Sequence, residues 1–125
     1  MLTTGIDLVE LRRMKKAIER GHFFTRVFGT QEQAELCSKK EFARLQSAAA
    51  CFAAKEAFSK ALGTGFRGFS LYEVQLIHDP LGKPFFLLTG KAEKIAKQQG
   101  LSFSVSVTHT REYAAAVVVA VREDK

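Results

Sequence analysis

The chain carries at residues 52–65 the stretch FAAKEAFSKALGTG, which closes its most strongly helical segment. From about residue 40 to residue 62 the sequence is rich in Ala, Leu, Lys and Glu and contains neither Gly nor Pro, so a long helix is predicted. The following Gly63-Thr64-Gly65 predicts its C-terminal cap. An advance of about 100° per residue separates an apolar side from a charged side. The charged side carries Lys55, Glu56, Ser59 and Lys60, with Phe52 among them.

Hydrophobic periodicity predicts shorter elements on both sides of this helix. Before it come a short buried strand, Leu2 to Ile6, a helix that begins at Asp7 and stops at Gly21, and a helical stretch at 31–37. After it the apolar period changes to two, which predicts strands at 71–77, 85–88, 103–108 and 113–121, with a helix at 91–99. Helices that precede strands are typical of an α+β fold, so we expect an antiparallel sheet packed against the long central helix.

Composition and charge fit one globular domain over residues 1–125, with 46% apolar and 26% charged residues. A net charge of +6 favours an anionic partner. The longest apolar run, Ala114 to Val121, has eight residues, whereas a membrane span needs about 18. Asp7 interrupts the N-terminus before the core of a signal peptide can form. Cys37 and Cys51 are too far apart for a CxxC pair, so we expect a cytoplasmic protein with reduced thiols.

Two carboxylates, Asp7 and Glu56, are the candidate metal ligands. Asp7 lies where the predicted first strand passes into a helix, and Glu56 lies on the charged side of the long helix. With phosphate oxygens and water in the remaining positions, the two carboxylates would suit Mg²⁺. Each also has a structural interpretation: Asp7 with Glu10 resembles a capping box, and Glu56 can pair with Lys60 at i,i+4.

Other polar residues point to phosphate chemistry, again with structural alternatives. Lys55 and Lys60 beside a Gly-Thr-Gly turn could hold a phosphorylated ligand, although the turn has the spacing of neither a Walker A loop nor GxGxxG. A solvated helix face with a glycine cap explains the same residues. His109 ends a predicted strand and could donate to a phosphate, act as a general base or make a structural hydrogen bond. Ser106 lacks a GxSxG elbow, which makes an acyl-transfer triad a weak hypothesis.

The first predicted helix is strongly basic on one side. Its exposed face carries Arg12, Arg13, Lys15, Lys16 and Arg20. Such a face can bind nucleic acid or an acidic protein, or can simply be solvated. Because neither a stacking-aromatic motif nor a helix-turn-helix pattern is visible, nucleic acid is the weaker of the two partners.

Read together and in order, several segments resemble bacterial holo-acyl-carrier-protein synthase, the short type of 4′-phosphopantetheinyl transferase. The segments are GIDLVEL at 5–11, an FxxR…E pattern at 23–32, FAAKEAFSKALGTG at 52–65, residues 79–84 with Gly-Lys-Pro, and VSVTHTREYAAAVVV at 105–119. The resemblance covers nearly the whole chain, and its most specific stretch is 52–65. It implies a 4′-phosphopantetheinyl transferase fold and a role in fatty acid and lipid biosynthesis.

The resemblance also implies a reaction and the residues that serve it. The family transfers the phosphopantetheine arm of coenzyme A onto a serine of apo acyl carrier protein and releases adenosine 3′,5′-bisphosphate. Asp7 and Glu56 would bind Mg²⁺, and Lys55 and Lys60 would hold the phosphates. The family site forms between subunits of a homotrimer. The remaining residues of the coenzyme A site would be Ser59, Gly63, Thr64, Gly65, Lys83, Pro84, His109 and Thr110.

By the same resemblance, the basic helix would bind the acidic carrier protein. Arg13 matches the family position that meets the carrier, and Arg20 and Phe24 would support it. The serine proton would pass to Glu56, to a Mg²⁺-bound water or to His109, and Lys60 would assist as a catalytic cation. One departure is Cys51, since many members have Arg immediately before FAAKEA. A phosphate or carrier contact is then missing or is made by Arg44 instead. The alternatives to an enzyme are a coenzyme A-binding module and a nucleic-acid-binding domain.

Overall fold

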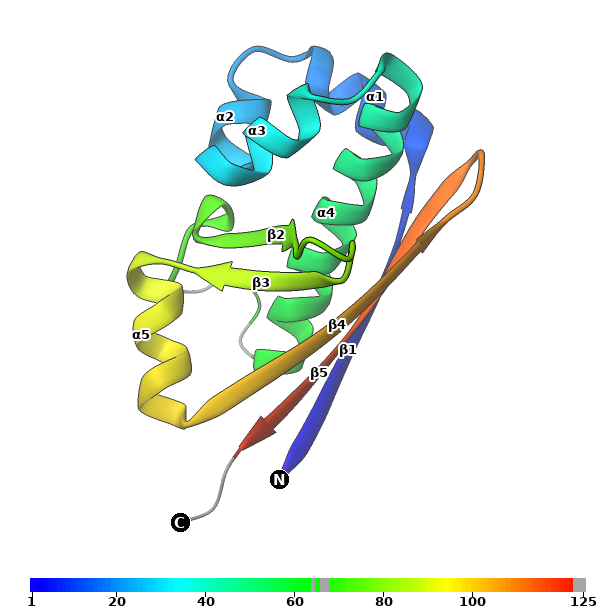
Figure 1. The fold of residues 1–125 in the computed structure, drawn as a ribbon. Coiled ribbons are helices and arrows are strands. Elements are labelled where there is room, and N and C mark those ends of the chain that lie inside the picture. Colours follow the sequence, from blue (N-terminus) through cyan, green and yellow to red (C-terminus); the bar gives the residue numbers. More distant parts are fainter. Residues whose placement is uncertain (64, 66–67, 123–125) are drawn as a thin grey trace.

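The computed structural model describes residues 1–63, 65 and 68–122, and its long helix spans the molecule (Figure 1). Strand β1 (Leu2–Glu10) leads into three short helices, α1 (Leu11–Glu19), α2 (Phe23–Val27) and α3 (Thr30–Cys37), and then into the long helix α4 (Glu41–Leu62). The remaining elements are η1 (Leu71–Glu73), β2 (Val74–His78), β3 (Pro84–Leu88), α5 (Gly90–Gln99), β4 (Leu101–His109) and β5 (Tyr113–Arg122).

Two antiparallel sheets lie against α4. The larger sheet has the order β1-β5-β4, and β2 and β3 form a two-stranded sheet. One face of β5 is buried and consists of small residues, Ala114, Ala116, Val118 and Ala120. These residues face an alanine-rich side of α4, so helix and sheet approach closely. The α+β prediction with an antiparallel sheet against a long central helix is therefore confirmed.

A close crossing fixes β1 against the C-terminal half of α4. A Cβ atom at Gly5 would lie 1.9 Å from the carbonyl oxygen of Ala57, a distance that real Cβ atoms do not show. Two residues earlier, the Thr3 hydroxyl donates to the carbonyl oxygen of Ala61 at 2.8 Å. Glycine at this position therefore allows the strand to pass directly over the helix, next to the turn that carries Glu56.

The structure corrects the predicted start of the chain. Asp7 lies within β1 rather than at a helix N-terminus, because residues 7–10 pair with residues 113–116 of β5. Helix α1 begins at Leu11, and Glu10 precedes it without a side-chain cap, so the predicted capping box is wrong. The first strand is also not buried on both faces, since Ile6 is 68% exposed. Its apolar residues on the face away from α4 require another explanation.

Helix α4 is amphipathic in a different way from the prediction. Its C-terminal cap is Gly63 at φ 79°, as expected, while Thr64 lies outside the described residues. Lys55 and Ser59 were expected on a charged, exposed side, but both are buried. Among the described helices, α4 included, none combines the length and apolarity that crossing a bilayer would require.

Candidate active site

A hollow in the surface lies between β1, α1 and α4. It is a cavity of about 750 Å³, and its lining includes Asp7 and Glu56 together with Arg13 and Arg20. Strand β1 supplies Asp7, the basic helix α1 supplies Arg13, and α4 supplies Glu56. The fold thus brings two candidate metal ligands and two candidate carrier-binding arginines to a single cavity.

Burial and neighbouring charges act on the carboxyl group of Glu56 in this cavity. Burial raises the pKa of Glu56, the negative charge of Asp7 raises it further, and Lys60 opposes both effects. The Lys60 ammonium lies 3.3 Å from Asp7 Oδ1 and donates to the carbonyl oxygen of Ile6 at 2.9 Å. The result is a site with two carboxylates and one ammonium, where a cation would be stabilised.

These two carboxylates fit a magnesium ion that takes its other ligands from elsewhere. Within residues 1–63, 65 and 68–122, no group of three or more His, Cys, Asp or Glu could hold a metal on its own. Mg²⁺ is commonly bound by one or two protein carboxylates, with waters and substrate phosphates completing its octahedron. The repulsion that raises the pKa of Glu56 is the kind that a divalent cation relieves. The donor chemistry of Asp7 and Glu56 is therefore suited to Mg²⁺ bound together with a phosphorylated substrate.

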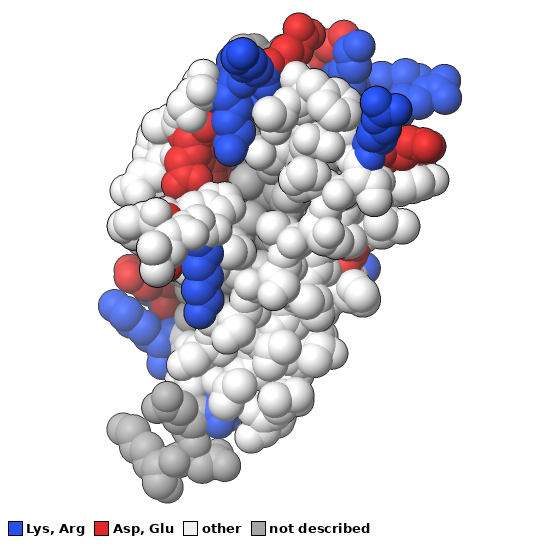
Figure 2. Space-filling model, turned by 45° about the vertical axis from the view of Figure 1, so that its right-hand side comes forward, with Lys and Arg blue, Asp and Glu red and all other residues white. Residues whose placement is uncertain are grey.

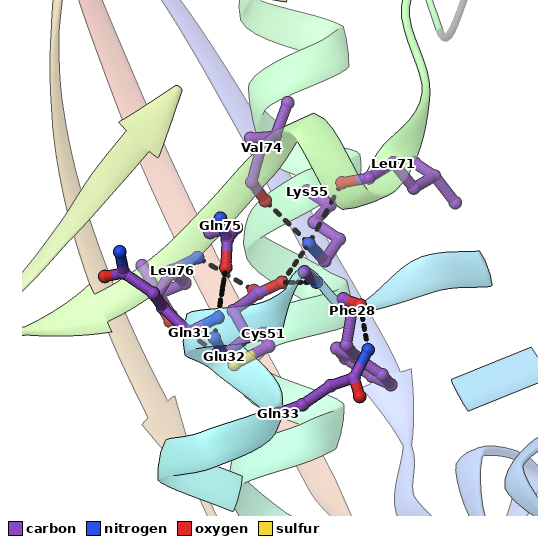
Figure 3. A network of polar contacts seen from close by, with 11 residues as sticks. Phe28, Gln31, Glu32, Gln33, Cys51, Lys55, Leu71, Val74, Gln75 and Leu76 are labelled. Atoms are coloured by element: carbon purple, nitrogen blue, oxygen red, sulfur yellow. Dashed lines mark hydrogen bonds and ion pairs between the residues drawn. The ribbon is translucent and has the colours of Figure 1, made fainter. Parts of the chain in front are cut away.

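Lys55 does not face this cavity, which contradicts its expected contact with phosphates. Its ammonium is fully buried and donates to Glu32 Oε1 at 2.6 Å and to the carbonyl oxygens of Val74 at 2.6 Å and Leu71 at 3.0 Å (Figure 3). Burial lowers the pKa of Lys55 and raises that of Glu32, and their attraction opposes both shifts. Because the three N–H groups of the Lys55 ammonium have these three acceptors, none is left to donate to a ligand.

Glu32 is the centre of this buried polar network. Its carboxylate also accepts the backbone N–H of Gly29 at 2.9 Å and that of Leu76 at 2.8 Å. The side-chain carbonyl of Gln75 in turn accepts the N–H groups at the start of α3 (Figure 3). The network joins α3, α4 and the η1–β2 segment, so its role is to fix the position of α4 rather than to bind a ligand.

The other predicted coenzyme A residues are divided between the core and surfaces away from the cavity. Ser59 is 3% exposed, and its hydroxyl donates to the carbonyl oxygen of Glu56 at 2.7 Å, within the same helix. Gly63 and Gly65 are exposed beyond the end of α4. Lys60 contacts Asp7 without lining the cavity. The lining also lacks Lys83 and Pro84 near the β2–β3 turn, and His109 and Thr110 at the end of β4.

Two of the three predicted carrier residues lie at the cavity. Arg13 and Arg20 line the cavity, but Phe24 does not; its ring packs 5.2 Å from that of Phe28. Phe23 lines the cavity in its place, and its ring lies 6.1 Å from that of Phe52, which also lines the cavity. Sequence reasoning also missed Phe52, although its position among charged residues was a usable signal.

Cys51 is buried, and Arg44 is exposed but bound to backbone carbonyls. Cys51 is 3% exposed, its sulfur lies 3.9 Å from the carbonyl oxygen of Leu76, and burial raises the pKa of its thiol far above the usual range. Arg44 donates to the carbonyl oxygens of Leu36 at 3.2 Å, Cys37 at 3.4 Å and Lys39 at 2.9 Å, which caps the end of α3. Arg44 does not line the cavity that holds Asp7 and Glu56, and the suggestion that it takes over a phosphate contact stays a prediction.

Comparison with known proteins assigns the chain to a family. The sequence model of the 4′-phosphopantetheinyl transferase superfamily matches residues 3–118. The chain belongs to this superfamily. It is 43% identical over 119 residues to the holo-[acyl-carrier-protein] synthase of Caldanaerobacter subterraneus, covering 94% of this chain and 92% of that protein.

Solved structures agree with this assignment. The holo-[acyl-carrier-protein] synthase of Neisseria meningitidis superposes with a TM-score of 0.87 at 35% identity, covering 96% of this chain and 98% of that one. The Helicobacter pylori synthase, solved in complex with coenzyme A, gives a TM-score of 0.79 at 31% identity, with 94% and 99% coverage. The predicted 4′-phosphopantetheinyl transferase fold is confirmed.

Proposed function

We propose that this chain is a holo-[acyl-carrier-protein] synthase. It transfers the 4′-phosphopantetheine arm of coenzyme A to a serine of apo acyl carrier protein and releases adenosine 3′,5′-bisphosphate. The observation that carries this proposal is the single cavity that joins Asp7 and Glu56 with Arg13 and Arg20. Family membership and curated synthases more than 40% identical to the chain support it.

The cavity suits phosphoryl transfer from a coenzyme A pyrophosphate. This reaction depends on alignment and charge neutralisation more than on covalent help from the protein. Asp7 and Glu56 would hold Mg²⁺, which when bound supplies positive charge to the pyrophosphate oxygens. Lys60 is an exposed cation 3.3 Å from Asp7 and would neutralise charge on the departing bisphosphate. Lys55 takes no part in the reaction, because its ammonium donates its hydrogen bonds to acceptors inside the protein.

The carrier serine must lose its proton as its oxygen attacks the β-phosphorus. Glu56 lies in the cavity, so its carboxylate can accept this proton directly or through a bound water. His109 lies at the end of β4, outside the cavity of its own chain, and would act only in the site of a neighbouring chain. We therefore favour Glu56 over His109 as the base supplied by the protein.

The carrier would approach along α1. Arg13 and Arg20 present positive charge to the cavity, while Phe23 and Phe52 supply an apolar wall beside it. Acidic residues flanking the carrier serine would meet the arginines, and an apolar side chain would meet the wall. Such charge pairing should raise the association rate and should weaken as salt is added.

The outer face of the larger sheet supports the predicted homotrimer with shared active sites. On β1, Leu2, Ile6 and Leu8 are each more than 60% exposed, and Val117 and Val121 on β5 extend the same apolar face. The centre of the surface on this side of the molecule is largely uncharged, while charged residues lie at its upper end and along its left edge (Figure 2). Apolar faces of this kind are typically covered by a partner, and here a second and third copy of the chain would cover them.

Shared sites would also explain the residues that lie away from the cavity. Lys83, Pro84, His109 and Thr110 would reach the coenzyme A of a neighbouring chain rather than that of their own. Sedimentation at micromolar concentration should give a mass three times that of the 13.9 kDa chain. A monomer that is fully active would contradict the shared site. The single domain over residues 1–125 and the cytoplasmic location stay predictions from the sequence.

The transfer is tested by intact-mass spectrometry of an apo acyl carrier protein after incubation with the protein, coenzyme A and Mg²⁺. We expect the carrier to gain the mass of one phosphopantetheine, and EDTA in excess over Mg²⁺ should prevent the gain. A folded protein that binds coenzyme A but modifies none of several carriers would instead be a coenzyme A-binding module. Binding to random duplex DNA that ignores added coenzyme A would favour the nucleic-acid alternative.

A further inference from the structure

Lys60 lies where it neutralises one of the two candidate metal ligands. Its Nζ is 3.3 Å from Asp7 Oδ1 and 2.9 Å from the carbonyl oxygen of Ile6, so strand β1 offers it two acceptors. The Lys60 side chain is 54% exposed, whereas that of Asp7 is 18% exposed. The ammonium therefore approaches a recessed carboxylate from the solvent side.

The charges around this contact favour an exchange of cations. Asp7 and Glu56 bring two negative charges, and Lys60, one helical turn after Glu56, brings one positive charge. A divalent cation at Asp7 would repel an ammonium at the same carboxylate, since like charges a few ångströms apart destabilise each other. Lys60 is long, flexible and half exposed, so it can leave Asp7 without disturbing the core.

We propose that the Lys60 ammonium occupies the Asp7 carboxylate in the metal-free protein and is displaced when the divalent cation binds, which frees it for the substrate phosphates. The inference rests on the proposed function, because it assigns the cation and the phosphates to that site. It adds a competition between Lys60 and the metal. Wild-type protein then binds the metal more weakly without coenzyme A than the two carboxylates alone would allow.

A lysine that competes with the metal can be distinguished from one that only binds phosphate by its effect on metal affinity. Replacing Lys60 by an uncharged residue should tighten metal binding in the absence of coenzyme A while slowing the transfer. Metal binding to the wild type must break the exposed ion pair and overcome repulsion from the ammonium, so we expect its removal to raise metal affinity roughly three- to tenfold. A lysine that only binds phosphate, or only supports the fold, would leave metal affinity unchanged or lower it.

The test is a titration with Mn²⁺, followed by the electron paramagnetic resonance signal of the free ion, without coenzyme A. Lys60→Met should bind Mn²⁺ more tightly than wild type, and Lys60→Arg, which keeps the charge, should bind it as wild type does. Lys94→Met removes an equal charge from the exposed face of α5 and serves as the matched control, with no change expected. Asp7→Asn should abolish the binding.

The outcomes separate this inference from the proposed function. If Lys60→Met binds Mn²⁺ no better than wild type while wild type modifies the carrier, the competition is refuted and the function stands. Equal tightening in Lys60→Met and Lys94→Met would also refute it, because the effect would then be one of net charge. If wild type neither binds Mn²⁺ nor modifies a carrier, the proposed function and the inference fail together.

Discussion

Gly5→Ala is a small change that should move the two candidate metal ligands, Asp7 and Glu56, away from each other. Gly5 crosses α4 at Ala57, which follows Glu56 in sequence, and Asp7 lies two residues further along β1. The added Cβ would lie 1.9 Å from the Ala57 carbonyl oxygen and 2.9 Å from the Ala61 nitrogen, while real Cβ atoms keep at least 3.0 Å. Strand and helix must therefore move apart by about 1 Å, against close packing on both sides.

Both stability and activity should report this displacement. Overpacking of a well-packed core costs about 1–3 kcal/mol, and we expect a loss of that size in the free energy of unfolding. Misplacement of a reacting geometry by about 1 Å can cost on the order of 10²-fold in rate, so the transfer should slow by roughly that factor. Urea denaturation measures the first effect, and the initial rate of carrier modification measures the second.

Gly21→Ala is the matched control for this variant. A Cβ atom at Gly21 meets no heavy atom within 4 Å, so the same chemical change should alter the free energy of unfolding by less than about 0.5 kcal/mol. The reasoning would be refuted if Gly5→Ala unfolded at the same urea concentration as wild type and modified the carrier at the same rate. A slower transfer with an unchanged free energy of unfolding would mean that β1 moves away from α4 without destabilising the fold.

Four further predictions concern the core, the cavity and the sheet. Lys55→Met leaves a buried carboxylate without its cation and should lower the free energy of unfolding by about 3–5 kcal/mol in urea denaturation; a loss below about 1 kcal/mol would contradict the buried network. Glu56 has a raised pKa in the folded protein, so it favours the folded state less as pH rises above its ordinary value of 4.5. Glu56→Gln should reduce that decline in urea denaturation at a series of pH values, and identical pH dependence would argue against the shift. His109→Ala should lower turnover by about 10²–10⁴ without abolishing it, and a complete loss in the mass assay would make His109 the essential base. Ile6→Lys places a charge on the exposed face of β1 and should shift sedimentation toward the monomer, whereas an unchanged trimer would place the interface elsewhere.

Local patterns predicted those elements whose own residues decide the conformation. The long run from residue 41 to residue 62 lacks Gly and Pro, and Gly63 ends it in a left-handed conformation, so α4 was predictable almost to the residue. Alternation of apolar and polar residues over β4 and the Val-rich apolar run of β5 likewise located both strands. Asp7 was misplaced because residues 7–10 become a strand only through their pairing with β5, which lies about 100 residues away in sequence and has no local signal.

Local sequence patterns were also insufficient to predict the candidate site. Asp7 and Glu56 are weak candidates in isolation, and the resemblance to a family made them specific. A helical projection placed Lys55 with the charged residues because it has no information about what covers each side of a helix. In the fold, α3 and β2 cover that side, and Glu32 supplies the countercharge that makes burial possible. Phe23 and Phe24 were indistinguishable until the structure showed which of them lines the cavity.

The central claim is that the cavity holding Asp7 and Glu56 carries out the transfer. The most direct measurement compares wild type with Asp7→Asn and Glu56→Gln, recording the intact mass of one apo carrier over time with coenzyme A and Mg²⁺. Far-ultraviolet circular dichroism shows in parallel that all three proteins are folded. The account predicts that wild type converts the carrier by the mass of one phosphopantetheine while both folded variants leave it unmodified. Conversion by either variant at the wild-type rate would contradict the account and would place the reaction elsewhere on the molecule.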